Sequence, residues 1–344
     1  MRMKVLAAVT FVAIGTASCV GTWPVRAQSV AEFYKGKSVA MIIGGSAGGG
    51  FDTLARGISR HIGKHIPGNP SVTPRNMPGA GGLLAMDHLY NIAAKDGTVI
   101  ALVGNTTPFV PLVTGKPARF DPLKMSWLGT PSVEAPLVIV WHTVPVKTVE
   151  DLKTRETTMG ASGADSPQAF FGRLLNTTLG TKMKIITGYQ GQNEIFIAME
   201  RGEVDGFPSA PYSSLTSTRP NWLRDGSINV VLQYGPEPLK EFPNVPWAQS
   251  LITDPADRAL MEVANAPNAM GRPLVMPPDL SADRLAAMRK ALSDTFKDPE
   301  FLEEAAKIGL IVNAPRTGEQ LYGVIRGAYA SVPATIERLR KLER

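Results

Sequence analysis

The sequence predicts an α/β protein in which mostly parallel sheets are flanked by helices. Short apolar runs of strand length recur along the chain, and most are followed by stretches with helical periodicity. The connections support the same fold class. Glycine-rich turns at 44–50, 78–82 and 160–167 each lead into an expected helix. Strands that alternate with helices in this way form βαβ units, which build parallel sheets.

The individual elements follow from local pattern. The nearly continuous apolar run 38–43 indicates a buried strand, and the helix expected at 52–66 is amphipathic. Ser166 is a suitable N-cap and Pro167 a suitable first residue for a helix at 167–179. Further strands are expected at 71–73, 98–103, 136–141, 157–162, 184–187, 204–207 and 228–233. Further helices are expected at 82–92, 149–153, 193–201, 281–296, 298–309 and from 317 onward, the last interrupted by Pro333.

The first residues have the pattern of an export signal. Arg2 and Lys4 precede a small, apolar run at 5–20, and the segment ending at Ala27 fits the small-x-small rule before a cleavage point. We therefore expect a signal peptide at 1–27 and a periplasmic mature protein. Lipid anchoring at Cys19 is the alternative. The apolar run is too short to span a membrane comfortably.

Composition limits what the mature chain can be. Cys19 is the only cysteine, so a mature chain of about 317 residues must depend on its hydrophobic core, and this length suggests two domains. The formal charge of +6 falls to about +3 without the signal. The chain has no basic block interleaved with aromatic residues, so we do not expect nucleic-acid binding.

The glycine turns themselves suggest an anion site. A helix N-terminus offers unpaired amide N–H groups, and glycine lets a ligand approach them closely. Their spacing does not fit a dinucleotide fold or a P-loop, so no cofactor is expected. No Arg or Lys lies inside the turns, so neutral donors are expected to hold the ligand.

Two catalytic or metal hypotheses remain as alternatives. The run 44–48, Gly-Gly-Ser-Ala-Gly, matches the nucleophile elbow of serine hydrolases, with Ser46 as nucleophile, but no histidine follows His142 to act as the base. His61 and His65 lie four residues apart on one helix face. We expect a solvated or hydrogen-bonded pair there rather than a metal site, because no H-E-x-x-H pattern surrounds them.

Several motifs together resemble those of a known family. The stretch 48–56 (GGGFDTLAR) resembles the G-G-x-x-D-x-x-A-R segment of the tripartite tricarboxylate transporter receptors, also called Bug-type solute-binding proteins. The stretch 76–82 (NMPGAGG) resembles their N-x-P-G-A-G-G, and 96–98 their D-G-x-T. Later, 188–191 and 202–205 resemble their Y-x-G turn and G-x-V-D motif. The resemblance extends from about residue 34 to the C-terminus.

The resemblance implies a two-lobed periplasmic binding protein of type II-like architecture, with two crossing segments as the hinge. Lobe 1 would combine 28–131 with 264–344, and lobe 2 would comprise 132–263. Such a receptor binds a small carboxylate between its lobes and passes it to integral membrane transporter subunits; a monomer is expected. An exported hydrolase using Ser46, or a ligand-sensing module for a signalling partner, is the alternative function.

The resemblance also implies which residues contact the ligand, through backbone amides, small hydroxyl groups and bound water. From lobe 1 these are Ser46, Ala47, Gly48, Asp52, Gly81 and Asn105. From lobe 2 they are Ser162, Gly163, Ser166, Tyr189 and Ser209. We add Phe51 and Asp165 as candidate contacts, although the chain departs from the family pattern at both.

The chain departs from the family pattern at four positions. Gly50 and Phe51 stand where small hydroxyl residues are common before the aspartate. The Phe51 ring either favours a ring-bearing or apolar ligand or marks a core position. Asp165 replaces a usual glycine and Ala169 a frequent histidine. An acid at 165 would repel a second carboxylate or pair with an amine or hydroxyl group, so a tricarboxylate is not the only expected ligand. Asp52 is expected to cap its helix or to fix the glycine turn.

Overall fold

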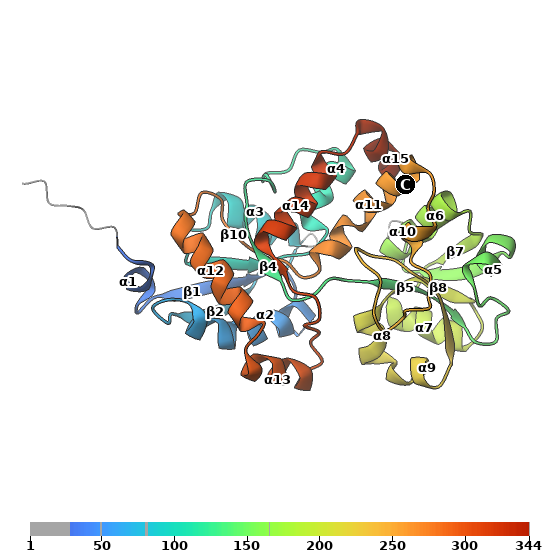
Figure 1. Ribbon diagram of the computed structural model, residues 1–344, viewed down its shortest axis with the longest axis horizontal. Helices are drawn as coiled ribbons and strands as arrows, with labels where there is room; N and C mark the ends of the chain where they lie inside the picture. The colour runs from blue at the N-terminus through green and yellow to red at the C-terminus, as the bar shows by residue number, and fades with distance from the viewer. Residues whose placement is uncertain (1–27, 49, 80–81, 165, 344) are drawn as a thin grey trace, which may run out of the picture.

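The computed structural model describes residues 28–48, 50–79, 82–164 and 166–343, and it confirms the two-lobed α/β fold. Two mixed sheets lie side by side in separate lobes (Figure 1). The signal-peptide prediction at 1–27, with Cys19, lies outside the described residues, as do Gly81 and Asp165. In the ranges that the structure describes, no helix combines the length and apolar character needed to cross a membrane.

The first lobe contains a six-stranded sheet in the order β11-β4-β10-β3-β1-β2. Helices α2 (Gly50–Ile62) and α12 (Ala282–Thr295) pack on one face of this sheet, and α3 (Leu83–Asn91) and α14 (Gly318–Tyr329) pack on the other. Its strands are β1 (Ser38–Ile43), β2 (Ser71–Asn76), β3 (Val99–Leu102), β4 (Ser126–Thr130), β10 (Leu274–Met276) and β11 (Arg316–Thr317). Its helices before the crossing are α1 (Val30–Tyr34), α2 (Gly50–Ile62), η1 (Gly63–His65), α3 (Leu83–Asn91), η3 (Thr107–Phe109) and α4 (Val110–Thr114).

The second lobe contains a five-stranded sheet in the order β7-β6-β8-β5-β9. Helices α5 and α6 pack on one face and α7 to α9 on the other. Its strands are β5 (Pro136–Trp141), β6 (Thr157–Ala161), β7 (Met183–Thr187), β8 (Gly206–Pro211) and β9 (Ile228–Gln233). Its helices are α5 (Val149–Thr154), α6 (Pro167–Leu179), α7 (Gln192–Glu200), α8 (Tyr212–Thr218), α9 (Pro220–Arg224) and α10 (Ala248–Leu251).

Both sheets are mixed because strands run back from the other lobe. In the first sheet β1 pairs in parallel with β2 and β3, while β10 is antiparallel to β3 and β4. In the second sheet β6 pairs in parallel with β7 and β8, while β5 is antiparallel to β8 and β9. The expected parallel βαβ units are therefore present, and each sheet gains an antiparallel strand that follows a crossing between the lobes.

Strand register places the carboxyl ends of the parallel strands toward the junction between the lobes. Leu274, the first residue of β10 after the return crossing, is level with Leu102 of β3 and Gly129 of β4. In the second lobe Pro136, the first residue of β5 after the outward crossing, is level with Pro211 at the end of β8. The turns that follow β1, β3, β6 and β8 therefore face the junction, where open α/β sheets bind ligands.

The two crossings touch each other. The outward crossing is the segment 131–135, and the return crossing runs through α11 (Pro255–Met270) to β10. The Glu134 amide donates to the Asn268 carbonyl (2.9 Å), and the Arg272 amide donates to the Thr130 hydroxyl (3.0 Å). Gly271, with φ 59° and ψ −111°, lies against the Ser132 carbonyl. The predicted lobe boundary at 263–264 falls within α11 and stays a prediction.

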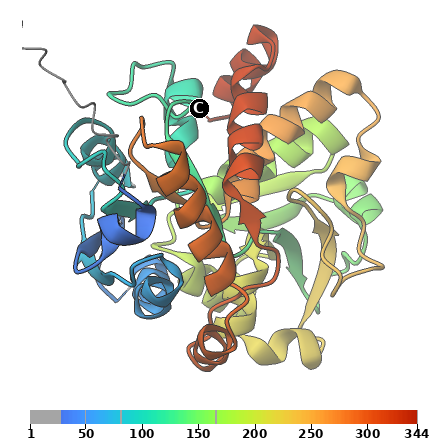
Figure 2. The same cartoon turned by 60° about the vertical axis from the view of Figure 1, so that its left-hand side comes forward.

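Four helices make up the C-terminal part of the chain: α12 (Ala282–Thr295), α13 (Pro299–Lys307), α14 (Gly318–Tyr329) and α15 (Pro333–Glu343). Helices α12 and α14 both pack on β4, and Figure 2 shows them in the foreground, α12 in orange and α14 in red. The last helix connects the lobes. Helix α15 packs against α4, α11 and α6. Arg340 of α15 donates to the Leu112 carbonyl (2.9 Å) in the first lobe, and Arg173 of α6 donates to the Leu342 carbonyl (2.7 Å).

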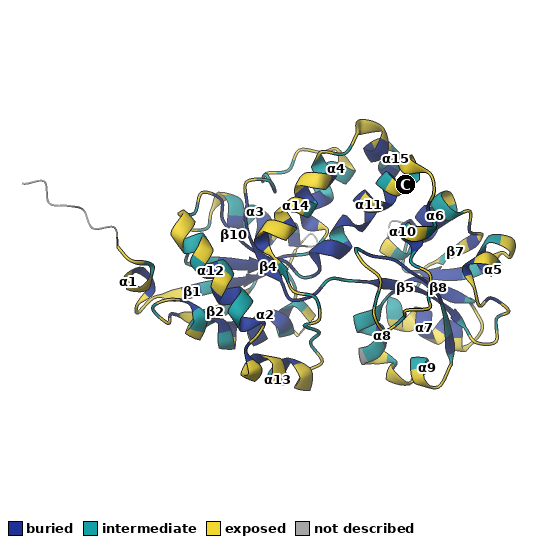
Figure 3. Ribbon diagram, viewed as in Figure 1, coloured by how far each residue is buried: buried dark blue, intermediate teal, exposed yellow. Residues whose placement is uncertain are grey.

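One continuous apolar cluster accordingly extends through both lobes. It joins Trp127 and Val275 of the first sheet to Val138 and Val140 of the second, through the buried face of α11 and helices α14 and α15. In Figure 3 the strands and α11 are largely buried, whereas α13 and α9 expose most of their surface. The junction is therefore a packed interface on the side of α11 and α15.

Gly271→Ala is predicted to destabilise the protein. The new Cβ would overlap the Ser132 carbonyl, and alanine is disfavoured at this positive φ. Strain and overpacking together should cost about 2–4 kcal/mol in the free energy of unfolding. Gly226→Ala is the control, because Gly226 has φ 67° with open space around it and should lose only the strain component. Urea denaturation of both variants measures the difference; equal losses would show that the crossings are not in close contact.

Candidate functional site

A buried carboxylate fixes the glycine turn after β1. Asp52 lies in the first turn of α2 and is 5% exposed. One of its oxygens accepts from the Gly48 amide (2.9 Å), and the other accepts from Arg56 (2.8 Å) and Asn76 (2.9 Å). Asn76 also donates to the Gly45 carbonyl (3.0 Å). Asp52 therefore fixes the conformation of the glycine turn, which is one of the two roles expected for it from the sequence.

These hydrogen bonds explain the acidity of Asp52. Arg56 and the Gly48 amide stabilise the charged form and lower the pKa of Asp52 from 3.8 to about 2, although burial opposes the shift. The same bonds occupy the carboxylate. The exposed surface of the turn is formed instead by Ser46, Ala47 and Gly48.

Phe51 and Asn105 lie on either side of this turn. Phe51 is half-buried, packs against the core of the first lobe, and has the Arg272 guanidinium over its ring at 5.9 Å. Asn105 follows β3 and donates to the Pro267 carbonyl (3.0 Å), one of the last carbonyls of α11, which have no partner within the helix. Asn105 therefore ties the end of β3 to the return crossing.

The turn after β6 is organised by its helix cap. Ser166 accepts from the Ala169 amide (3.3 Å) and donates its proton to the Gly163 carbonyl (2.7 Å), which confirms it as the N-cap of α6. Ser162 donates to Gln168 (3.3 Å). Both serines and Gly163 are half-buried at the carboxyl end of β6. The Ser166 hydroxyl is thus used in shaping the turn.

Tyr189 and Ser209 are positioned by the strands on either side of β6 in the second sheet. Tyr189 follows β7, is half-buried and packs against the core below α7, and burial raises its pKa. Ser209 is buried in β8, and the Tyr234 hydroxyl donates to the carbonyl of the preceding residue, Pro208 (3.2 Å). The aspartate of the 202–205 motif, Asp205, is structural: it accepts from the amide and hydroxyl of Thr158 (both 2.7 Å). The described contact candidates thus fall on segments that follow β1, β3, β6 and β7, in the first turn of α2 and within β8, and their role as ligand contacts stays a prediction.

The lobes meet in a polar pocket that was not predicted from the sequence. It has a volume of about 220 Å³. Gly50 and Thr53 of α2 line one wall, Ser213 and Ser214 of α8 line another, and Glu134 and Arg272 come from the two crossings. Arg272 thus places a cation beside the first glycine turn, although no Arg or Lys lies inside it. The expectation that neutral donors hold the ligand stays a prediction. Arg272 donates to the Gly50 carbonyl (3.3 Å) although 222 residues separate the two.

Two other cavities lie near the junction. A more apolar pocket of about 430 Å³ lies between α4, α6 and α11 and is lined by Asn105, Pro167 and Asn268, among others. A groove of about 620 Å³ lies between α11, α14 and the segment after β9. The first contains a predicted site residue, Asn105; the second contains none.

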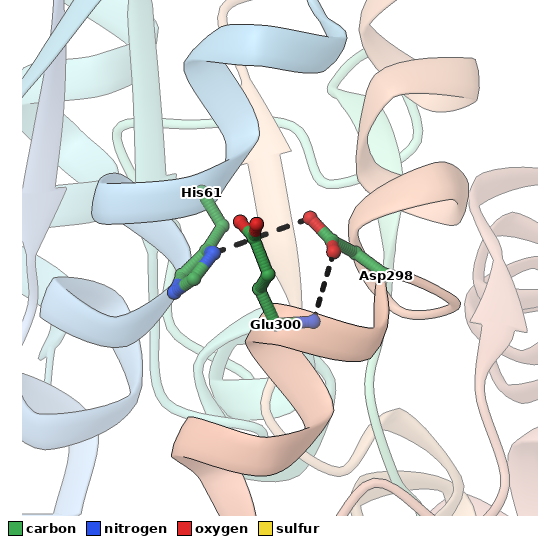
Figure 4. A group of neighbouring side chains, drawn as sticks. All are labelled: His61, Asp298 and Glu300. Carbon is green, nitrogen blue, oxygen red and sulfur yellow. Dashed lines mark hydrogen bonds and ion pairs between the residues drawn. The ribbon is translucent and has the colours of Figure 1, made fainter.

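The two histidines belong to an ion-pair cluster between α2 and α13. His61 bonds Glu304 (2.8 Å) and His65 bonds Asp298 (3.0 Å), as the hydrogen-bonded alternative predicts. Figure 4 shows His61, Asp298 and Glu300 converging, with ligand atoms within 4.8 Å of one another. Lys64 lies 2.6 Å from Asp298 and lowers the pKa of that carboxyl. Its ammonium therefore supplies the positive charge that a metal ion would otherwise bring.

Asp52→Asn is predicted to loosen the first glycine turn. Asparagine can accept from fewer of the three donors and loses the charge opposite Arg56, so unfolding at pH 7 should become easier by about 1–3 kcal/mol. Urea denaturation measures the change. Asp279→Asn is the control, because Asp279 pairs with Lys95 (3.0 Å) at the surface with 76% of its side chain exposed, and it should change stability little.

The stability difference between the wild type and Asp52→Asn is predicted to depend on pH, and the direction of this dependence follows from the pKa of Asp52. The pKa of Asp52 is lower in the folded state, so its contribution is complete above about 3.8 and disappears as the pH falls through about 2. The stability difference between the wild type and Asp52→Asn should be constant from pH 7 to 5 and narrow toward pH 2. A difference that stays constant to pH 2 would contradict the assignment.

Comparison with known proteins identifies relatives of this chain by sequence and by fold. No family model matches the chain. An Agrobacterium vitis protein described as a UPF0065 protein in the TAR-I ttuE-ttuC' intergenic region is 25% identical over 312 residues, which cover 88% of this chain and 82% of that protein.

Solved structures show the same architecture. A ligand-free TctC solute-binding protein from Polaromonas has a TM-score of 0.70 at 15% identity, over 90% of this chain and 98% of that one. MatC from Rhodopseudomonas palustris with bound malate has a TM-score of 0.55 at 19% identity, over 90% and 99%. Another R. palustris protein, with adipate, has a TM-score of 0.56 at 16% identity, over 89% and 97%. The chain therefore has the two-lobed fold of the TctC- and Bug-type periplasmic solute-binding proteins.

Proposed function

We propose that this protein is an extracytoplasmic receptor that binds a small organic acid between its lobes and delivers it to a tripartite tricarboxylate-type membrane transporter. The observation that carries the proposal is the position of the glycine turns at the carboxyl ends of β1 and β6, in different lobes that face one junction. Related folds with malate or adipate bound support a carboxylate as the ligand.

The two turns suit a ligand that must be released again. Exposed backbone at 46–48 and hydroxyl groups at 46 and 162 offer neutral donors, and helices α2 and α6 begin beside them. Closure of one lobe toward the other would bring these donors to one carboxylate. This supports a receptor rather than an enzyme. We further propose that the protein acts in the periplasm, as a monomer.

Ser46→Ala and Ser162→Ala are each predicted to weaken binding of a four- to six-carbon carboxylate about 3- to 10-fold, the effect of one lost hydrogen bond. Ser71→Ala is the control, since Ser71 is exposed at the amino end of β2. Calorimetry with malate, succinate and adipate measures affinity. If none of the acids binds or raises the melting temperature of the wild type, the receptor proposal is wrong. Ester turnover that disappears in Ser46→Ala would favour the hydrolase instead.

Deleting the gene is predicted to reduce cellular uptake of the acid that the purified protein binds. Uptake of labelled ligand should recover when the wild-type gene is restored. It should recover only partly with the Ser46→Ala gene, in proportion to the lost affinity. Unchanged uptake after deletion would favour a ligand-sensing module over a transport receptor.

A further inference from the structure

The polar pocket at the crossings has the position expected of a part of the ligand site. Gly50 and Thr53 belong to the helix that follows the first glycine turn, and Ser213 and Ser214 belong to α8, which follows directly after β8. Glu134 and Arg272 lie between them on the two crossing segments. A molecule in this pocket therefore contacts both lobes and both crossings.

The pocket contains two opposite charges that only partly satisfy each other. Arg272 Nε and Glu134 Oε1 are 4.0 Å apart, beyond the distance of a direct hydrogen bond, and their side chains are only 27% and 20% exposed. Charges that are largely withdrawn from water are costly unless they are well paired. A ligand that completes their bonds would gain the interactions that the pair itself lacks.

Arg272 has donors to offer. In the described part of the chain, its guanidinium uses a single N–H to bond the Gly50 carbonyl at 3.3 Å. A guanidinium carries five N–H donors arranged to match a carboxylate. The Phe51 ring, 5.9 Å from the guanidinium, limits where the guanidinium can lie and keeps it beside the first residues of α2. Arg272 is therefore placed to receive a carboxylate.

The Glu134 carboxylate determines which ligand groups are favourable next to the Arg272 guanidinium. Ser213 donates to one of its oxygens (3.2 Å), and the other oxygen faces Arg272. Burial raises the pKa of Glu134, while Arg272 and Ser213 act to lower it. Its oxygens accept hydrogen bonds, and a second carboxylate next to them would be repelled. A hydroxyl or ammonium group would instead be attracted.

We propose that Arg272 and Glu134 form a specificity subsite for an organic acid that carries a hydrogen-bond donor, either a hydroxyl or an amino group, close to one carboxylate. Arg272 binds that carboxylate and Glu134 accepts from the donor. The proposal rests on the receptor function proposed above and narrows its ligand class.

Three four-carbon acids test the subsite, because malate, aspartate and succinate differ only in a hydroxyl, an amino group or neither. By calorimetry, the wild type should bind malate or aspartate at least about 10-fold more tightly than succinate. Comparison of malate with aspartate then shows whether the subsite prefers a hydroxyl or an amino group. Glu134→Gln should remove most of this preference. Arg272→Gln should weaken all three acids about 10- to 100-fold, the effect of losing a charged hydrogen bond.

Arg316→Gln is the matched control. Arg316 is similarly buried (22% exposed) and pairs with Glu237 at 3.6 Å, but it lines the groove beside α14 rather than this pocket. It should leave all three affinities unchanged. Arg272→Lys keeps the positive charge but lacks the planar guanidinium and its paired N–H donors, so it should retain part of the affinity. It stands in if Arg272→Gln does not fold, as judged by circular dichroism and melting temperature.

The outcomes separate the two proposals. If the wild type binds no organic acid, the receptor function fails. If it binds them but shows no preference for a donor-bearing acid, the subsite proposal fails and the receptor function stands. The subsite also fails if Glu134→Gln and the Arg272 variant that folds behave like Arg316→Gln.

Discussion

The shape of the glycine turn after β1 depends on the buried carboxylate of Asp52. A run of glycines after a strand has many accessible conformations, and fixing each one costs conformational entropy. By accepting from Gly48, Arg56 and Asn76, Asp52 links the turn to its own helix and to the end of β2. One negative charge thus orders the ends of two neighbouring strands, and it leaves the backbone of 46–48 facing outward.

The crossings place that surface opposite the second lobe. Each crossing is followed by a strand that pairs antiparallel in the sheet it enters, β5 in one lobe and β10 in the other. The ends of the neighbouring strands are therefore aligned with the crossing residues. Gly271 allows the segments to approach closely enough for hydrogen bonds in both directions. The position of Glu134 and Arg272 between the lobes follows directly from this contact.

Much of the fold could be predicted from local sequence. Strand β1, the capped start of α6 and the glycine turns depend on interactions within a few residues. Helix α11 was not predicted, because residues around most of its circumference are buried and Pro267 lies inside it, so it has no single apolar stripe. The boundaries of β8 shifted from 204–207 to 206–211 because Asp205 binds Thr158 beside the strand instead of entering it. Arg272 and Glu134 could not be placed, since only the folded crossings bring them to α2.

The attachment of α15 to both lobes determines what kind of motion the molecule can make. Arg340 holds carbonyls of α4, while Arg173 of α6 holds the carbonyl of Leu342. Since these contacts lie on the same side of the junction as the continuous core, separation of the lobes there would expose apolar surface and break charged hydrogen bonds. We therefore expect any relative motion of the lobes to hinge on that side. Helices α8 and α13, which lie on the opposite side of the molecule in Figure 1, would then move the most.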